Sequence, residues 1–203
     1  VIVLSDLLPR ATEALIRRQP NLTVEVRRGV NKDLLPSLAL GQLDFVVSGT
    51  PTPLTDDSLI STVLFVLRDT VVARAGHRLN RPGSLTIDDV LSERWIFAPN
   101  SIQRQRLDAL ARSLGRKEPA VIVESDSIQF RKAAVEGTDL LTLLPPNYVE
   151  REVTAGILAK LNVSEIDWTT PVSLIRRKAS EPTAAARALM AEVRRISATF
   201  QWN

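Results

Sequence analysis

The sequence predicts an α/β fold of two lobes that two long strands connect. Helical patterns alternate with short apolar or β-branched strands along most of the 203 residues, and this rhythm is typical of sheets covered by helices. The β-branched run Val63–Ala75 is long enough to leave one sheet and enter another, and Val172–Arg177 can return the chain to the first sheet. We therefore expect lobe I at residues 1–74 plus 172–203, lobe II at residues 75–171, and a cleft between them.

The composition predicts a folded domain and narrows the classes of function. Hydrophobic residues make up 44% of the chain and charged residues 24%, which allows a substantial core. No apolar run approaches the length of a membrane span, and no signal-peptide pattern occurs. The absence of Cys excludes disulfides and thiolate metal sites and fits a reducing compartment. We expect a cytoplasmic protein with no cofactor, no metal and no membrane partner.

The charge pattern does not indicate a nucleic-acid surface. The net charge is only +3, and the arginine pairs Arg17-Arg18, Arg27-Arg28 and Arg194-Arg195 are scattered among acids. Solvated faces and salt bridges explain them better than a phosphate-binding patch. Aromatic residues make up 4% of the chain, which is too few for a platform that stacks single strands.

The first predicted helix begins near Asp6, whose carboxylate can cap it. Pro9 falls in the first turn, where its missing N–H does no harm. Leu8, Ala11 and Leu15 follow at helical spacing and predict the buried face of this helix.

Two strands and a short helix come next. Asn21–Arg28 alternates apolar and polar side chains, which predicts a half-exposed strand. Asp33–Leu40 predicts a helix that Asp33 caps and Gly41 ends, because glycine enters the left-handed conformation without a Cβ penalty. Phe45–Val47 predicts a strand buried on both faces, and the polar residues after it end that strand. The rhythm favours a parallel sheet, and such sheets bind ligands at the carboxyl ends of their strands.

The remainder of the chain repeats this alternation after a turn-rich linker, Gly76–Ser84. Asp89 lies in the capping-box position relative to Thr86. The predicted helices begin at Thr86, Ser101 and Ser127, a short one reaches Gly156, and the last runs from about Pro182 to Phe200. The predicted strands are Trp95–Ala98, Ala120–Glu124, Leu140–Leu144 and Ile157–Leu161, the last at a sheet edge. The predicted buried stripes are Leu107, Leu110, Ala111 and Leu114, then Ala186, Leu189, Met190, Val193 and Ile196.

The sequence shows no groups arranged for covalent chemistry. His77 is the only imidazole and lies in the linker, where a turn or packing role is commoner than catalysis. No nucleophile elbow, phosphate-binding glycine loop or dinucleotide fingerprint occurs. The adjacent carboxylates Asp56-Asp57 and Asp88-Asp89 are explained by loops and helix starts. We therefore expect that the protein is not an enzyme.

Hydroxyl and amide side chains recur where a strand gives way to a helix or loop. These residues are Asn31, Thr50, Ser101 and Ser127. As N-caps, Ser101 and Ser127 satisfy free helix N–H groups. If such helix starts converge on one cleft, their N–H groups also form a site for a carboxylate or other anion. Arg104 and Arg131 could either face that anion or pair with a surface acid.

Segments along the whole chain occur in an order and spacing that resembles a known family. They are Leu7–Ala11, the strand ending at Gly29, Leu34-Leu35 with Leu38, Gly41–Asp44, Gly76–Leu79, Pro99–Ser101 with Arg104, Glu124-Ser125, Val135–Gly137 and Leu143–Pro145. These segments are similar to the effector-binding domain of LysR-type transcriptional regulators. Arg10, directly after Leu7-Leu8-Pro9, and the string Gly41–Asp44 resemble a branch of the family that controls sugar or aromatic-acid catabolism.

The resemblance implies a fold and a ligand site. The family fold has two Rossmann-like lobes joined by two crossover strands, which is the type 2 periplasmic-binding-protein-like arrangement. A small-molecule inducer, such as an organic acid, an aromatic acid or a sugar derivative, binds between the lobes. Carried over by position, the inducer-contacting loops fall at Asn31, Thr50, Ser101 and Ser127.

The resemblance also implies partners. In the family, the first helix and second strand of one chain pair with the second lobe of another, so we expect a homodimer, and a tetramer in the full-length protein. A winged helix-turn-helix precedes this domain in such regulators, and none is present in this sequence. We therefore expect contact with operator DNA only through that missing domain. The alternative is a free-standing periplasmic solute-binding protein of a transporter, which predicts a monomer.

Two features depart from the family pattern. Only six residues precede Leu7, so residues 1–4 either form the first strand of the fold or begin the first helix. The spacing favours the helix, which would remove a usual effector contact. Pro36 is also unexpected, although a helix capped at Asp33 tolerates it.

Overall fold

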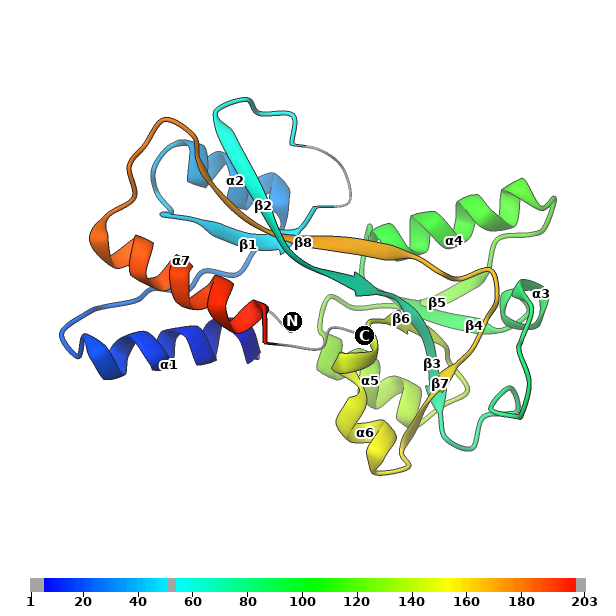
Figure 1. Cartoon of the computed structure of the whole chain (residues 1–203). Coiled ribbons are helices and arrows are strands. Elements are labelled where there is room, and N and C mark those ends of the chain that lie inside the picture. The colour runs from blue at the N-terminus through cyan, green and yellow to red at the C-terminus, as the bar shows by residue number, and fades with distance from the viewer. Residues whose placement is uncertain (1–5, 51–53, 200–203) are drawn as a thin grey trace. The chain divides into compact units, whose positions relative to one another are not determined.

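A computed structural model of the chain describes residues 6–50 and 54–199 (Figure 1). The chain divides into two compact units, Val1–Leu67 with Thr169–Asn203 (unit 1) and Arg68–Trp168 (unit 2). It therefore passes between the units twice, whereas the sequence pattern predicts these passages near residues 74 and 172. The predictions for residues 1–4 and for the end of the last helix at Phe200 lie outside the described residues.

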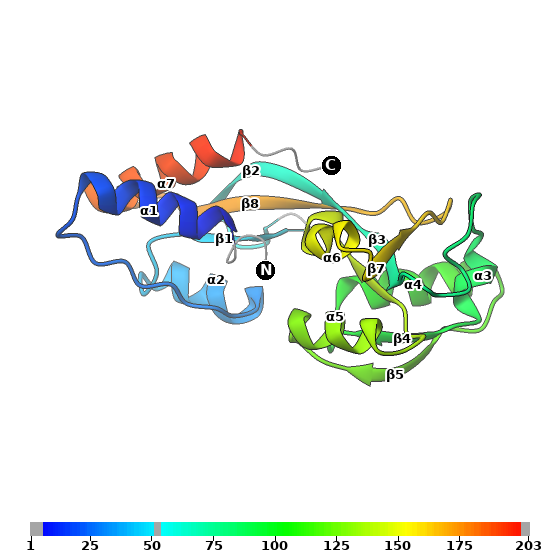
Figure 2. The ribbon, with the colours of Figure 1, turned by 90° about the horizontal axis from the view of Figure 1, so that it is seen from below.

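Unit 1 is a three-stranded sheet with helices on both faces. Its elements are α1 (Leu8–Arg18), α2 (Asn31–Ala39), β1 (Val46–Gly49), β2 (Leu59–Arg68), β8 (Thr169–Arg177) and α7 (Ala184–Ser197). The strand order is β1-β8-β2, so the returning strand lies in the middle. Helices α1 and α7 lie side by side on one face, and α2 lies on the other (Figure 2). Arg18 of α1 reaches the buried Glu192 carboxylate of α7 at 2.8 Å, which ties the two helices, and Arg195 of α7 contacts the same carboxylate at 2.8 Å.

The expected parallel pairing is wrong for the ladder between β1 and β8. Val46 lies opposite Ile175 and Gly49 opposite Val172, and the two strands are antiparallel. The prediction of a half-exposed strand at Asn21–Arg28 is also wrong, because residues 21–30 form no ladder in the described structure. Alternation favours an extended chain, but a strand forms only where a second strand accepts its N–H groups.

The predicted cap of the first helix is wrong as well. The N-cap of α1 is Leu7, which makes no side-chain capping bond, and the Asp6 carboxylate instead pairs with Arg10 at 2.7 Å. Leu7, Ala11 and Leu15 are buried, whereas Leu8 is only half-buried. The apolar face therefore begins one residue earlier than the pattern predicts.

The helix before Gly41 starts earlier than predicted. Helix α2 begins at Asn31 with Val30 as its N-cap, so Asp33 lies in the first turn and does not cap. A carboxylate is still favourable there because it faces the positive end of the helix dipole. The prediction for Gly41 is confirmed, since it ends the helix at a φ of +79°.

Arg177 from β8 fastens this helix end. Its Nη1 donates to the carbonyls of Leu38 at 2.7 Å and Leu43 at 2.6 Å, so this side chain links the last turn of α2 to the loop that follows it. Arg177 thereby holds the turn at Gly41 against the central strand of unit 1.

Replacing Arg177 by Met should lower the free energy of unfolding by about 2 kcal/mol, because two charged hydrogen bonds are lost from half-buried carbonyls. Urea denaturation monitored by circular dichroism measures this loss. Lys178→Met, at an exposed neighbouring position, is the control and should change stability little. Equal stability of the two variants would contradict the fastening role.

Unit 2 contains two sheets and most of the predicted helix starts. Its elements are β3 (Thr70–Arg74), α3 (Ile87–Leu91), β4 (Arg94–Phe97), α4 (Ile102–Ser113), β5 (Ala120–Glu124), α5 (Ile128–Glu136), β6 (Thr142–Leu144), the 3₁₀ helix η2 (Pro146–Tyr148), α6 (Glu150–Thr154) and β7 (Leu158–Leu161). Strand β3 lies between β6 and β7, antiparallel to both, and β4 pairs with β5 in parallel. The four strands predicted for lobe II and the edge position of β7 are confirmed.

The long run Val63–Ala75 changes sheet as the sequence predicts. It is divided at Asp69 into β2 of unit 1 and β3 of unit 2. The Asp69 N–H donates to the Trp168 carbonyl at 2.8 Å, so the outgoing and returning segments are joined there.

Candidate functional site

The carboxyl ends of two parallel strands meet at one edge of unit 2. Phe97 at the end of β4 lies opposite Glu124 at the end of β5, and the Ser125 N–H donates to the Phe97 carbonyl at 2.8 Å. The following residues turn into α4 and α5. Open α/β sheets bind ligands at such an edge.

Ser101 and Ser127 begin the two helices at this edge. The Ser101 hydroxyl accepts the Arg104 N–H at 3.3 Å, and the Ser127 hydroxyl accepts the Phe130 N–H at 3.2 Å. Both N-cap predictions are confirmed. Asn100, at a φ of +54°, makes the turn that leads into Ser101. The hydroxyls thus lie beside the positive ends of two helices, which favour a negatively charged or strongly polar ligand.

Asn31 and Thr50 meet at the end of β1 in unit 1. The Asn31 side-chain amide donates to the Gly49 carbonyl at 2.9 Å. The Thr50 hydroxyl lies 2.9 Å from the Ser173 hydroxyl, and the Thr50 N–H donates to the Pro171 carbonyl at 2.8 Å. The structure therefore brings these two predicted residues, from the start of α2 and the residue after β1, together at the end of β1.

Sequence reasoning missed three more hydroxyls at this strand end. Ser173 lies opposite Ser48 in the ladder, and Thr170 packs so closely that its Cγ2 would lie 3.1 Å from a Cβ added at Gly49. The buried hydroxyls of Ser48 and Thr170 have no hydrogen-bond partner in the described residues. The alternation of Ser48 in β1 and Thr50 just after it was the available signal, but their neighbours on β8 are distant in sequence.

The two arginines left open by the sequence differ in their surroundings. Arg104 is paired with the acids Glu124 and Asp108. Arg131 on α5 is buried, its Nε–H lacks a hydrogen-bond partner in the described residues, and burial lowers its pKa.

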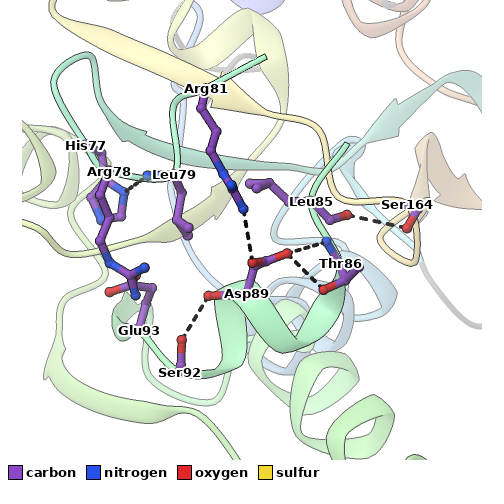
Figure 3. A network of polar contacts seen from close by, with 10 residues as sticks. All are labelled: His77, Arg78, Leu79, Arg81, Leu85, Thr86, Asp89, Ser92, Glu93 and Ser164. Carbon is purple, nitrogen blue, oxygen red and sulfur yellow. Dashed lines mark hydrogen bonds and ion pairs between the residues drawn. The ribbon is translucent and has the colours of Figure 1, made fainter. Parts of the chain in front are cut away.

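His77 belongs to a structural network rather than to this edge. It is buried, and its Nδ1 accepts the Leu79 N–H at 3.1 Å (Figure 3). Figure 3 also shows Asp89 accepting from the Thr86 N–H and hydroxyl, which closes the predicted start of α3. The ion pair of Arg78 with Glu93 fastens the linker to the end of that helix. These contacts agree with a turn and packing role.

Asp69 is a third buried ionisable group in unit 2, in addition to Arg131 and His77. Burial raises the pKa of its carboxyl to about 6, although the Gln103 amide at 3.4 Å and the charge of Arg106 partly offset this effect. The described residues contain no group of three or more His, Cys, Asp or Glu that could hold a metal ion. Within the same residues, no helix has the length and apolar character needed to span a membrane.

The fold and the polar strand ends define a two-unit α/β binding domain. The description of the matching family model is LysR substrate binding domain, and it matches residues 2–197, so the chain belongs to this family. The HTH-type transcriptional regulator PcaQ of Agrobacterium fabrum is 27% identical over 190 residues, which cover 93% of this chain. The chain spans only 61% of the length of that regulator.

Solved structures confirm the predicted type 2 periplasmic-binding-protein-like fold. The regulatory domain of CcmR from Synechocystis PCC6803, in complex with 2-PG, superposes with a TM-score of 0.81 at 15% identity, over 95% of this chain and 92% of that one. The BenM effector binding domain with its effector benzoate gives 0.76 at 20% identity, over 99% and 90%. The family match supports a ligand-sensing regulatory domain rather than the transporter-linked alternative.

Proposed function

We propose that the chain is the effector-sensing part of a longer, cytoplasmic bacterial transcriptional regulator. It binds a small molecule without transforming it, and it reaches operator DNA only through a separate winged helix-turn-helix domain. The observation that carries this proposal is the pair of helix starts, Ser101 and Ser127, at the shared edge of two parallel strands in a chain of the LysR family. The effector is an organic acid, an aromatic acid or a sugar derivative.

The proposed effector contacts are Ser101 and Ser127 in unit 2 and Thr50 and Asn31 in unit 1. Each of these four side chains already makes a hydrogen bond to a nearby backbone or hydroxyl group, and this bond fixes the orientation of the side chain. Preorganised polar groups lose little entropy when a ligand binds. An effector that binds one arrangement of the domain more tightly than another shifts the population toward it and so transmits the signal.

A thermal-shift screen of organic acids, aromatic acids and sugars tests the effector contact. Ser101→Asn keeps a good N-cap but adds bulk, and it should weaken binding of a stabilising compound about tenfold. Ser113→Asn, at the other end of α4, is the matched control and should bind normally. An unchanged response of Ser101→Asn would place the binding site elsewhere.

We also propose that the domain forms a homodimer, and a tetramer in the full-length protein. Unit 1 carries an apolar groove of about 550 Å³ between α1 and Val26, and its lining includes the 43% exposed Ile16. In unit 2, Ile122 on β5 and Phe130 on α5 are both more than half exposed, and β5 pairs only with β4 in the described structure. An open strand edge beside apolar side chains is a surface suited to a second copy.

Sedimentation equilibrium tests this dimer. Ile16→Arg places a charge in the groove and should shift the domain toward monomers by at least about tenfold in dissociation constant. Ile60→Arg, at a similarly exposed isoleucine of β2, should leave the dimer intact. A wild-type domain that stays monomeric at high concentration, or equal effects of both variants, would contradict the proposed interface.

A further inference from the structure

The start of α5 carries a buried cation. Arg131 is only 7% exposed, although it lies in the second turn of the helix, four residues after the N-cap Ser127. Side chains of a helix tilt toward its N-terminus, so the Arg131 side chain extends over the first turn. Consistent with this direction, the charge of Asp126, which directly precedes the N-cap, acts on the guanidinium, as does the nearby Tyr148.

This cation differs from its basic neighbours. Lys132, the next residue, is paired with Glu152, and Arg104 on α4 is paired with Glu124. The Arg131 Nε–H is buried and has no hydrogen-bond partner among residues 6–50 and 54–199. A buried guanidinium with an unpartnered N–H is unfavourable, because burial removes hydration from that group and no hydrogen bond replaces it.

Further donors lie in the same turn. The Ser127 hydroxyl accepts the Phe130 N–H, and the Arg131 N–H bonds to the Ser127 carbonyl. The N–H groups of Ile128 and Gln129 precede the first intrahelical bond and have no acceptor in the described part of the chain. Two free N–H groups and one guanidinium therefore surround the first turn, and all of them are donors.

We propose that this α5-start site, formed by Ser127, Ile128, Gln129 and Arg131, binds an anionic group, so that the effector carries a carboxylate or another oxyanion. The inference rests on the proposed function, which makes Ser127 an effector contact. An oxyanion offers acceptors to the N–H groups and a bidentate partner to the guanidinium. A neutral polar ligand would satisfy the backbone N–H groups but would add no negative charge beside the buried Arg131 guanidinium to that of Asp126.

Thermal unfolding of the 203-residue chain tests this site at constant ionic strength. The anionic probes are inorganic phosphate, benzoate and gluconate, and the neutral probes are benzamide and glucose. The variants are Arg131→Gln, Arg131→Lys and, as a control with the same charge change on exposed α6, Arg151→Gln. Circular dichroism verifies that each variant is folded.

The expected result is stabilisation of the wild type and of Arg151→Gln by at least one anionic probe. Arg131→Gln should need at least about tenfold more of that anion for the same shift, and Arg131→Lys should lie between the two. Without any probe, Arg131→Gln should unfold at the wild-type temperature or above it, because the variant removes a charge whose burial is unfavourable.

The proposal is overturned if no anion stabilises the wild type more than Arg131→Gln, or if Arg131→Gln unfolds at a lower temperature yet keeps the full response. Stabilisation by glucose or benzamide that Ser101→Asn weakens but Arg131→Gln does not would remove the anion site and leave the proposed function standing. A phosphate response that depends on Arg131, with no compound sensitive to Ser101→Asn, would support the anion site and count against the proposed function.

Discussion

Replacing Trp95 by Ala is expected to lower the free energy of unfolding of unit 2 by about 4 kcal/mol. Trp95 is fully buried on β4, and its ring stacks on that of Phe97 at a centroid distance of 5.3 Å. Its Nε1–H donates to the Val90 carbonyl at 3.0 Å. The substitution therefore removes a large apolar volume and also leaves a buried carbonyl without its donor.

Urea denaturation measured by far-UV circular dichroism gives the size of this loss. Phe130→Ala is the matched control, because this aromatic residue of the same unit is 54% exposed and should change stability by less than about 1 kcal/mol. A loss below about 2 kcal/mol for Trp95→Ala would mean that the core of unit 2 collapses around the gap. The effect matters for function because β4 carries the loop that ends in Ser101.

Local chemistry made the helix starts of unit 2 predictable. Ser101 and Ser127 cap the helices that the sequence predicts, because an N-cap is a bond between residues three positions apart. Leu107 and Ala111 are fully buried as the stripe predicts, whereas Leu114 is 46% exposed because α4 ends before it. The two serines follow the carboxyl ends of β4 and β5, which lie side by side because these two strands pair in parallel. The sequence predicts both strands.

The errors fall where the outcome depends on residues distant in sequence. Asn21–Arg28 has a strand pattern but no partner strand in the described structure, and no local signal reports a missing partner. Asp6 had an equally good partner in Arg10 and paired with it instead of capping. For the same reason the sequence did not predict that Ser173 lies beside Thr50, and it left open whether Arg131 pairs with an acid.

The stability of unit 2 is expected to fall as the pH rises from about 4 to about 6, and Asp69 is the cause. Burial raises the pKa of its carboxyl from an ordinary 3.8 to about 6, so the folded unit holds this proton more tightly than the unfolded chain does. The stabilising contribution is fully present below pH 3.8 and is lost as the pH rises through about 6. The pKa difference corresponds to about 3 kcal/mol in the free energy of unfolding.

Asp69→Asn should remove this pH dependence, because the amide stays neutral and still offers an oxygen to the Gln103 side chain. At pH 7 the variant should exceed the wild type by up to about 3 kcal/mol, and at pH 4 the two should be nearly equal. Asp88→Asn is the control, since the Arg116 guanidinium holds the pKa of Asp88 below its ordinary value and gives the opposite pH dependence. Parallel pH profiles for the wild type and Asp69→Asn would show that the Asp69 carboxyl titrates normally. Asp69 also donates its N–H to the Trp168 carbonyl, and both residues lie where the chain passes from one unit to the other. A negative charge that forms on the Asp69 carboxyl above about pH 6 therefore acts on the segment that joins the two units in sequence.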